Sequence, residues 1–83
     1  MLLHVYTVRD GKAAAYLQPF FVPNDSVAIR AMTDCVTDEN HAFGKHPEDY
    51  SLYACGIYDD VTGKFELLDA PKHLVNLIDL AGE

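Results

Sequence analysis

A β-hairpin pattern between Leu52 and Leu68 constrains the fold of this chain more than any other feature of the sequence. Two runs rich in aromatic and aliphatic side chains flank the short connection "DDVTGK", where Gly63 suits the positive φ of a tight turn. Side chains of a strand alternate between its two faces. The first run therefore has two apolar faces: Leu52, Ala54, Gly56 and Tyr58 on one, and Tyr53, Cys55 and Ile57 on the other. Two apolar faces require two covering layers.

Two further strands are predicted before this hairpin. Leu2–Val8 and Ala15–Val22 are rich in β-forming residues. Asp10 and Gly11 lie between them and form a strong turn signal, because both residue types tolerate positive φ. Pro19 has no amide proton to donate, so the second strand belongs at a sheet edge or carries a bulge.

Two helices complete the predicted order. The segment "VAIRAMTDCV" has apolar side chains at helical spacing and follows the capping residues 24–26. Residues 38–50 are predicted to form a long polar loop, a type of segment that often carries function. Pro71 suits the first position of a C-terminal helix. The apolar side of that helix would consist of Leu74, Leu77, Ile78 and Ala81.

The whole chain, residues 1–83, is long enough for one small domain. The order β-β-α-β-β-α predicts an α+β fold with a small, mostly antiparallel four-stranded sheet and one long helix packed on one face. Either the C-terminal helix covers the second face or another chain does. We therefore expect a homo-oligomer, most simply a dimer. The expected interface residues are Tyr53, Cys55, Ile57, Leu74, Leu77 and Ile78.

The charge and cysteine content limit the possible partners. A formal net charge of −7 repels polyanions at long range, so nucleic-acid binding starts at a disadvantage. Cys35 and Cys55 form no CxxC motif, and the sequence has neither a signal-peptide pattern nor a long apolar run. We expect a cytoplasmic protein with two free thiols and no membrane partner.

The sequence offers no convincing catalytic constellation. Its carboxylate pairs are Glu48-Asp49 and Asp59-Asp60. Acidic residues are ordinary at turns, and adjacent residues on a strand point to opposite faces, so neither pair indicates a catalytic site. The four histidines are scattered, whereas a zinc ion needs three or four ligands. We expect no enzymatic activity, no metal site and no cofactor.

Aromatic side chains suggest a different kind of site. The chain has five tyrosines and four phenylalanines, and aromatic side chains on a sheet interleaved with basic residues can stack single-stranded bases. Phenylalanines in the predicted strands are expected in the core, whereas a buried tyrosine hydroxyl needs a partner. The predicted nucleic-acid-binding residues are Arg9, Lys12, Lys45, Tyr50 and Tyr53.

Three segments, "AYLQPFF", "AIRAMTDCV" and "KHPEDYSLYACGIYDDVTGKFELLDAP", together resemble the small non-structural protein of microviruses, the gokushovirus-like bacteriophages with circular single-stranded DNA genomes. The resemblance covers nearly the whole chain, and its C-terminal tail matches least. It implies a protein made in the cytoplasm of the infected bacterium and absent from the mature virion. It also implies DNA binding, or a role in the switch to single-stranded genome synthesis, and it assigns no binding residues.

Two functions follow from these observations. The first is a non-enzymatic phage accessory protein that binds single-stranded DNA or acts in genome replication. The alternative is a protein–protein interaction module that contacts a phage or host protein without binding nucleic acid. The net charge of −7 favours the alternative, whereas the tyrosines and the resemblance favour the first.

Overall fold

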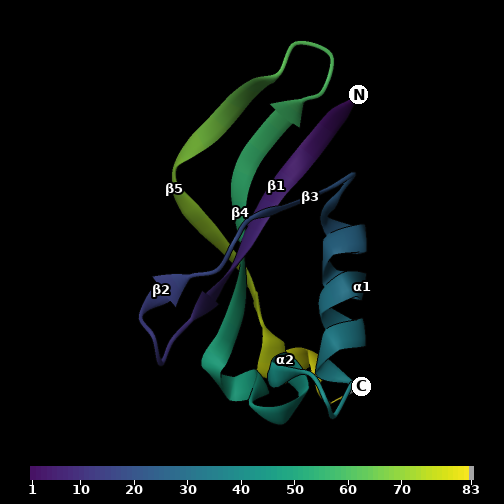
Figure 1. The fold of residues 1–83 in the computed structure, drawn as a ribbon, viewed down its shortest axis with the longest axis vertical. Helices are drawn as coiled ribbons and strands as arrows, with labels where there is room; N and C mark the ends of the chain where they lie inside the picture. The colour runs from purple at the N-terminus through teal and green to yellow at the C-terminus, as the bar shows by residue number, and fades with distance from the viewer. Residues whose placement is uncertain (83) are drawn as a thin grey trace.

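The computed structural model describes residues 1–82, which form one antiparallel sheet with all helices on one side (Figure 1). The α+β prediction is confirmed. The elements in chain order are β1 (Leu2–Asp10), β2 (Ala15–Tyr16), β3 (Phe20–Val22), α1 (Asp25–Val36), α2 (Ala42–Lys45), the 3-10 turn η1 (Pro47–Asp49), β4 (Tyr50–Asp59), β5 (Lys64–Asn76) and α3 (Leu77–Leu80).

The strand order is β2-β1-β4-β5, and β3 pairs with the same strand, β1, as β2 does. The second predicted strand is therefore divided in two, which raises the strand number from four to five. Pro19 lies in the gap between β2 and β3, where its missing amide proton breaks no ladder. Both short strands lie at the sheet edge, as Pro19 predicted.

A β-bulge at Cys55 changes the direction of the side chains in β4. Tyr6 of β1 lies opposite Ala54, and the preceding β1 residue, Val5, lies opposite Gly56, so Cys55 has no partner on β1. Gly56 has a φ of +149°, and a Cβ there would lie 2.2 Å from the carbonyl oxygen of Glu66. A residue with a side chain does not fit this position, so glycine allows β5 to approach β4 closely.

The bulge exchanges the faces of the second half of β4, so the simple alternation predicted from sequence is wrong beyond Ala54. Leu52, Ala54 and Ile57 face the helices, and we call this side of the sheet the helix face. Tyr53 and Tyr58 point to the opposite side, which we call the open face. One extra residue in a strand shifts a period of two by one position, which moves every later side chain to the other face.

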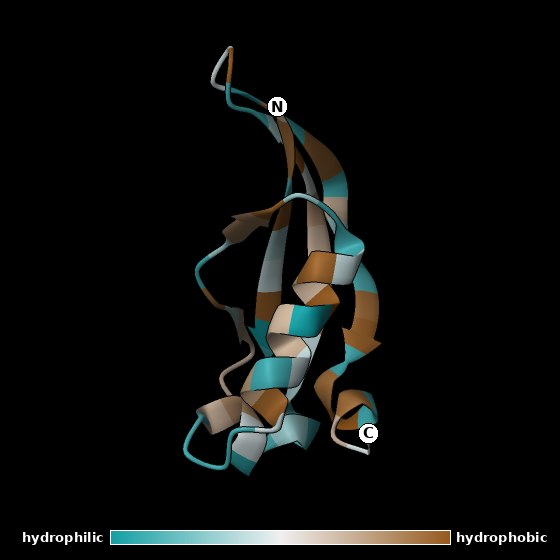
Figure 2. Ribbon diagram, turned by 90° about the vertical axis from the view of Figure 1, so that its right-hand side faces the viewer, coloured by the Kyte–Doolittle hydropathy of each residue, from teal (hydrophilic) through white to brown (hydrophobic). Residues whose placement is uncertain are grey.

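Helix α1 forms where the capping and apolar patterns predicted it. The Asn24 side chain accepts a hydrogen bond of 3.0 Å from the backbone N–H of Val27, which caps the first turn. Its buried stripe, Ala28, Met32 and Val36, packs with the sheet residues Tyr6, Val8 and Leu52. Figure 2 shows this helix in front of the sheet with hydrophobic and hydrophilic residues alternating along it. The core therefore lies between α1 and the sheet.

The C-terminal helix is much shorter than predicted. Strand β5 continues through Pro71 to Asn76, and α3 is a single turn. Pro71 is tolerated because residues 68–71 of this edge strand bulge away from β4 and have no partner there. Leu77 in α3 is fully buried and belongs to the same core as α1. In the described residues no helix covers the open face (Figure 1).

The predicted long loop contains two short turns, α2 and η1. Phe43 of α2 is buried in the core and contacts Tyr50, with ring centroids 4.6 Å apart. Gly44 permits a close approach, because a Cβ there would lie 2.0 Å from the carbonyl oxygen of Asp38. This segment closes one end of the core. None of the helices within residues 1–82 has the length and apolar character that a membrane crossing requires.

Candidate functional site

The open face combines apolar, aromatic and basic side chains. Its members, placed by strand register, are Leu3, Val5, Thr7, Arg9, Tyr16, Phe21, Ser51, Tyr53, Gly56, Tyr58, Phe65, Leu67, His73 and Asn76. Among the described residues, no paired strand position on this face is acidic. The acidic residues at paired strand positions, Asp10, Asp59 and Glu66, point to the helix face. The chain is strongly acidic overall, yet this face carries none of that charge at its paired positions.

One end of the open face carries a cluster of aromatic rings and basic side chains, which we call the basic cluster: Arg9, Tyr16, Tyr53 and His73. The rings of Tyr16 and Tyr53 meet edge to face with centroids 5.4 Å apart, and the ring of His73 meets Tyr53 at the same distance. The guanidinium carbon of Arg9 lies 6.0 Å from the centre of the Tyr16 ring, within the range of a cation–π contact.

Hydrogen bonds at the end of β5 orient the histidine of this cluster. A ring nitrogen of His73, Nε2, lies 2.7 Å from Oδ1 of Asn76, and the Ser51 hydroxyl donates to the same oxygen at 2.9 Å. Because an amide oxygen only accepts, the His73 ring donates to Asn76 Oδ1 through Nε2. Two strands thus hold the ring of His73 against Tyr53.

The other end of the open face carries three packed aromatic rings, Phe21, Tyr58 and Phe65, which we call the aromatic triad. Their centroids are 5.4 Å apart for Phe21 and Tyr58, 6.1 Å for Phe21 and Phe65, and 4.7 Å for Tyr58 and Phe65. Phe65 is 51% exposed and Phe21 is 40% exposed, so the prediction that the strand phenylalanines lie in the core is wrong for these two residues, whereas Phe20 packs against the core. Between the two clusters Val5 and Thr7 are buried, and the Thr7 hydroxyl donates a hydrogen bond of 2.7 Å to the carbonyl oxygen of Leu17, in the connection between β2 and β3.

The predicted nucleic-acid-binding residues divide between the two sides of the sheet. Arg9 and Tyr53 lie in the basic cluster, on the open face. Lys12 lies in the exposed turn after β1. Tyr50 and Lys45 lie elsewhere, because Tyr50 packs on the helix side and Lys45 ends α2.

Sequence reasoning missed several residues of these clusters, namely Tyr16, Phe21, Tyr58, Phe65 and His73. One signal could have found the first of them. The turn after Asp10 sets the register of β1 with β2, and that register places Tyr16 opposite Arg9. His73 had no such signal, because residues 71–76 were predicted as helix and not as strand.

The expected oligomer residues do not share one surface. Tyr53 is on the open face, Cys55 is in the bulge, and Ile57 is on the helix face. Leu77 is fully buried in the core of the single chain, and Leu74 packs partly buried against that core, in β5 and not in a helix. Ile78 is 46% exposed.

The helix face contains one further polar contact at the start of α1. Tyr6 is fully buried, and its hydroxyl donates a hydrogen bond to the carboxylate of Asp25. Burial, together with this hydrogen bond and the nearby negative charge, raises the pKa of Tyr6 above its ordinary value of 10. A shallow recess of about 250 Å³ next to this pair is lined by His4, by Lys72 and by apolar residues of β4 and β5. This contact ties α1 to β1.

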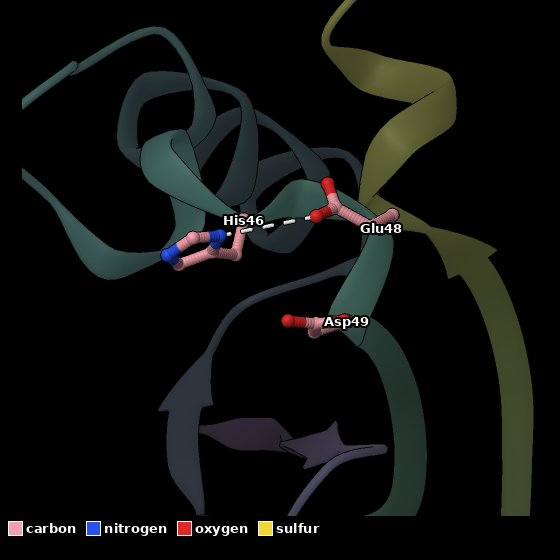
Figure 3. Close-up of side chains that lie close together, drawn as sticks. All are labelled: His46, Glu48 and Asp49. Atoms are coloured by element: carbon pink, nitrogen blue, oxygen red, sulfur yellow. Dashed lines mark ion pairs between the residues drawn. The ribbon is translucent and has the colours of Figure 1, made fainter.

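Three potential metal ligands lie close together at η1, namely His46, Glu48 and Asp49 (Figure 3). Their ligand atoms lie within 4.8 Å of one another, and Nδ1 of His46 is 3.9 Å from Oε1 of Glu48. His46 and Glu48 are exposed. Asp49 also has a structural role, because its backbone carbonyl accepts a hydrogen bond from the N–H of Gly11 at 2.8 Å. Three mostly exposed ligands are fewer than calcium requires from a protein, and we assign this group no function.

The two cysteines, Cys35 and Cys55, are free thiols and partly buried. Burial is the main cause that raises the pKa of both the Cys35 and the Cys55 thiol, and Asp34 and Asp38 add to the effect at Cys35. A raised pKa keeps a thiol protonated and unreactive at neutral pH.

The fold and the site define a small α+β protein whose sheet is covered by helices on one face and carries aromatic clusters on the other. The family model of the Phage ORF5 protein matches residues 3–80. Because this match spans nearly all of the chain, the protein belongs to the phage ORF5 family and is a bacteriophage accessory protein. No curated protein and no solved structure matches the chain.

Proposed function

We propose that this protein is a non-enzymatic accessory protein of a microvirus-like phage and that it binds single-stranded DNA through the open face of its sheet. One observation carries the proposal. Among residues 1–82, no paired strand position on the open face holds an acidic residue, although the chain has a net charge of −7. The acidic side chains that repel DNA at long range therefore lie outside the paired strand positions of the open face. A strand of DNA on the open face would contact aromatic rings and one arginine.

The basic cluster has the chemistry that such binding needs. Every base has a π-face, so a base can stack on Tyr16 or Tyr53 without regard to its identity. Tyr16 is 47% exposed, and its ring contacts the ring of Tyr53 edge to face. Arg9 beside this ring can contact a phosphate, and Lys12 follows in the adjoining turn. The side chain of His73 adds a further ring at the same end.

The aromatic triad offers a second stacking surface on the same face. Phe65 and Phe21 are 51% and 40% exposed, and Tyr58 lies between them and contacts both. The two clusters lie at opposite ends of the sheet, so a single strand can contact both by following the direction of β4. The proposed place of action is the cytoplasm of the infected bacterium, during replication or the switch to single-stranded genome synthesis, and not the mature virion.

Fluorescence anisotropy with labelled oligo-dT tests the proposal. Substitution of Tyr53 by Leu removes the ring and keeps the bulk, and each lost stacking contact is worth about 1–3 kcal/mol, so affinity should fall roughly tenfold or more. Tyr53→Phe is the matched control and should bind like the wild type, because stacking needs the ring and not the hydroxyl. No binding of wild-type protein at low salt would overturn the proposal.

The alternative function is a protein–protein interaction module that uses the same face. Leu67 is 63% exposed beside Phe65, and exposed apolar side chains of this kind also occur at protein interfaces. The anisotropy experiment separates the two functions. A protein module would show no affinity for oligo-dT at any salt concentration, and a pulldown from infected cells would recover a protein partner whose binding depends on Phe65 and Leu67.

A further inference from the structure

The two edges of the sheet differ in how they are protected. The edge on β1 is covered only by β2 and β3, which are two and three residues long and are separated by the segment with Pro19. Short strands and proline prevent another chain from adding to a sheet. The opposite edge is β5, which has 13 residues, and no strand of the described chain pairs with its outer side.

Only the first part of β5 is regular enough to accept another strand. Residues 64–67 pair in an unbroken register with β4, whereas residues 68–71 bulge away from the ladder and include Pro71. The regular part belongs to the β4–β5 hairpin, which extends beyond the start of α1, so no helix covers it (Figures 1 and 2). An exposed strand with free backbone N–H and C=O groups is a template for a second strand.

The charges of this segment favour a second copy of the same chain. Lys64 and Glu66 are exposed on the helix face, and within residues 1–82 neither of them forms an ion pair. We propose that two copies pair antiparallel along residues 64–66 of β5, around a two-fold axis at Phe65. Each Lys64 then lies opposite Glu66 of the second copy, and this pair occurs twice in the dimer.

The neighbouring registers are unfavourable. Residues that lie opposite one another in an antiparallel ladder share a face, so in a symmetric pair the axis passes through a residue that meets its own copy. An axis at Lys64 places two lysines opposite each other, and an axis at Glu66 places two glutamates opposite each other, which is destabilising. The axis at Phe65 instead pairs opposite charges and brings two exposed phenylalanine rings together on the open face.

The dimer also changes the open face. Phe65 belongs to the aromatic triad, so pairing at Phe65 places the two triads side by side and joins the two open faces into one continuous surface. The basic cluster of each copy lies at the far end of that surface. The pairing itself depends on the edge and its charges, and it does not require that the proposed DNA binding is correct.

A charge-swap experiment tests the pairing without DNA. Sedimentation equilibrium at micromolar concentrations should show a monomer–dimer equilibrium for the wild type. Lys64→Glu places glutamates opposite each other, and Glu66→Lys places lysines opposite each other. Each variant alone should therefore have a dimer dissociation constant roughly tenfold higher than that of the wild type. An equimolar mixture of the two variants restores both opposite-charge pairs and should form a heterodimer. The mixture also excludes misfolding as the cause, because misfolded variants would not associate with each other.

Three results would overturn the proposal. They are a wild-type protein that sediments only at the monomer mass, single variants that dimerise as well as the wild type, and a mixture that stays monomeric. The second result would mean that another surface forms the dimer, and the third that Lys64 and Glu66 do not face each other across the axis. Repeating the anisotropy titration with Lys64→Glu then shows whether DNA binding survives in the monomer.

Discussion

The helix face and the open face are built from the same strands, yet they differ in chemistry. The helix face holds the fully buried side chains Tyr6 and Leu52, and the acidic residues at paired strand positions point to this side. The open face has exposed aromatic rings, with Phe65 at 51%, and carries Arg9 and His73. The comparison indicates a division of labour, in which one face stabilises the fold and the other remains available for a ligand.

The division has a simple physical basis. A small domain buries a limited share of its surface, and α1, α2 and α3 all lie on one side of the sheet. Large aromatic side chains on the other side remain partly wet, and each forgoes some of the stabilisation that full burial provides. Exposed aromatic clusters of this kind are typical of binding surfaces. Substitutions confined to one face or the other test whether the two faces play separate roles.

The largest effect is expected on the free energy of unfolding when a buried side chain of the helix face is shortened. Leu52→Ala removes a fully buried side chain from the core and should lower the free energy of unfolding by about 2–5 kcal/mol. Leu67→Ala, on the open face and 63% exposed, is the matched control and should change it by less than about 0.5 kcal/mol. Urea denaturation measures both. Equal losses for the two variants would show that the open face is also part of the core.

A smaller loss is expected from the glycine that allows the bulge. Gly56→Ala places a Cβ against the carbonyl oxygen of Glu66 at a φ that L residues rarely adopt, which should cost about 1–3 kcal/mol. Gly63→Ala tests a positive φ of 73° without any steric contact and should cost about 1 kcal/mol. Thermal or urea unfolding of the two variants compares them. A Gly56→Ala variant as stable as the wild type would contradict the close approach of β5 to β4.

The hydrogen bond between Tyr6 and Asp25 should contribute a similar or smaller amount. Tyr6→Phe removes the hydroxyl and should lower stability at neutral pH by about 1.5 kcal/mol. The pKa of Tyr6 is raised in the folded protein, so folding favours the protonated hydroxyl. Its contribution is fully present below pH 10, the ordinary pKa of tyrosine, and is lost as the pH rises above that value.

Urea unfolding at several alkaline pH values measures this linkage. The wild type should lose stability more steeply above pH 10 than Tyr6→Phe does, because the variant lacks the group that must ionise. The other tyrosines are the same in both proteins, so their effects cancel in the comparison. Parallel pH profiles for the two proteins would contradict a buried, hydrogen-bonded Tyr6.

The smallest effect concerns the salt dependence of DNA binding. For single strands, the slope of log affinity against log salt is about −0.7 for each phosphate contact. Arg9→Ala on the open face should make the slope shallower by about 0.7, whereas Lys45→Ala at the end of α2 should leave it unchanged. Anisotropy titrations at several salt concentrations give both slopes. A change with Lys45→Ala alone would place the DNA on the helix side.

Much of the fold could be predicted from the sequence because its signals are local. The cap at Asn24 and the apolar spacing predicted α1, and the connection with Gly63 predicted the β4–β5 hairpin. Pro19 predicted an edge strand with an irregularity. These features depend on residues close together in the chain, where propensity and pattern decide the structure.

The errors arose where partners distant in the chain decide the structure. The bulge at Cys55 depends on the fit of Gly56 against β5, and periodicity alone does not contain that information. Pro71 is an ordinary helix-start signal, yet edge pairing with β4 keeps residues up to Asn76 in the strand. The basic cluster was predicted only in part for the same reason, since His73 reaches Tyr53 through strand pairing.

The proposal that the open face is the DNA-binding face has one most direct test, a titration of isotopically labelled protein with oligo-dT followed by amide NMR. If DNA binds the open face, shift changes should concentrate at Arg9, Tyr16, Tyr53 and His73 and along the strands that carry them, with the amides of α1 unaffected. Changes centred on α1 and α2, or no changes at low salt, would contradict the proposal.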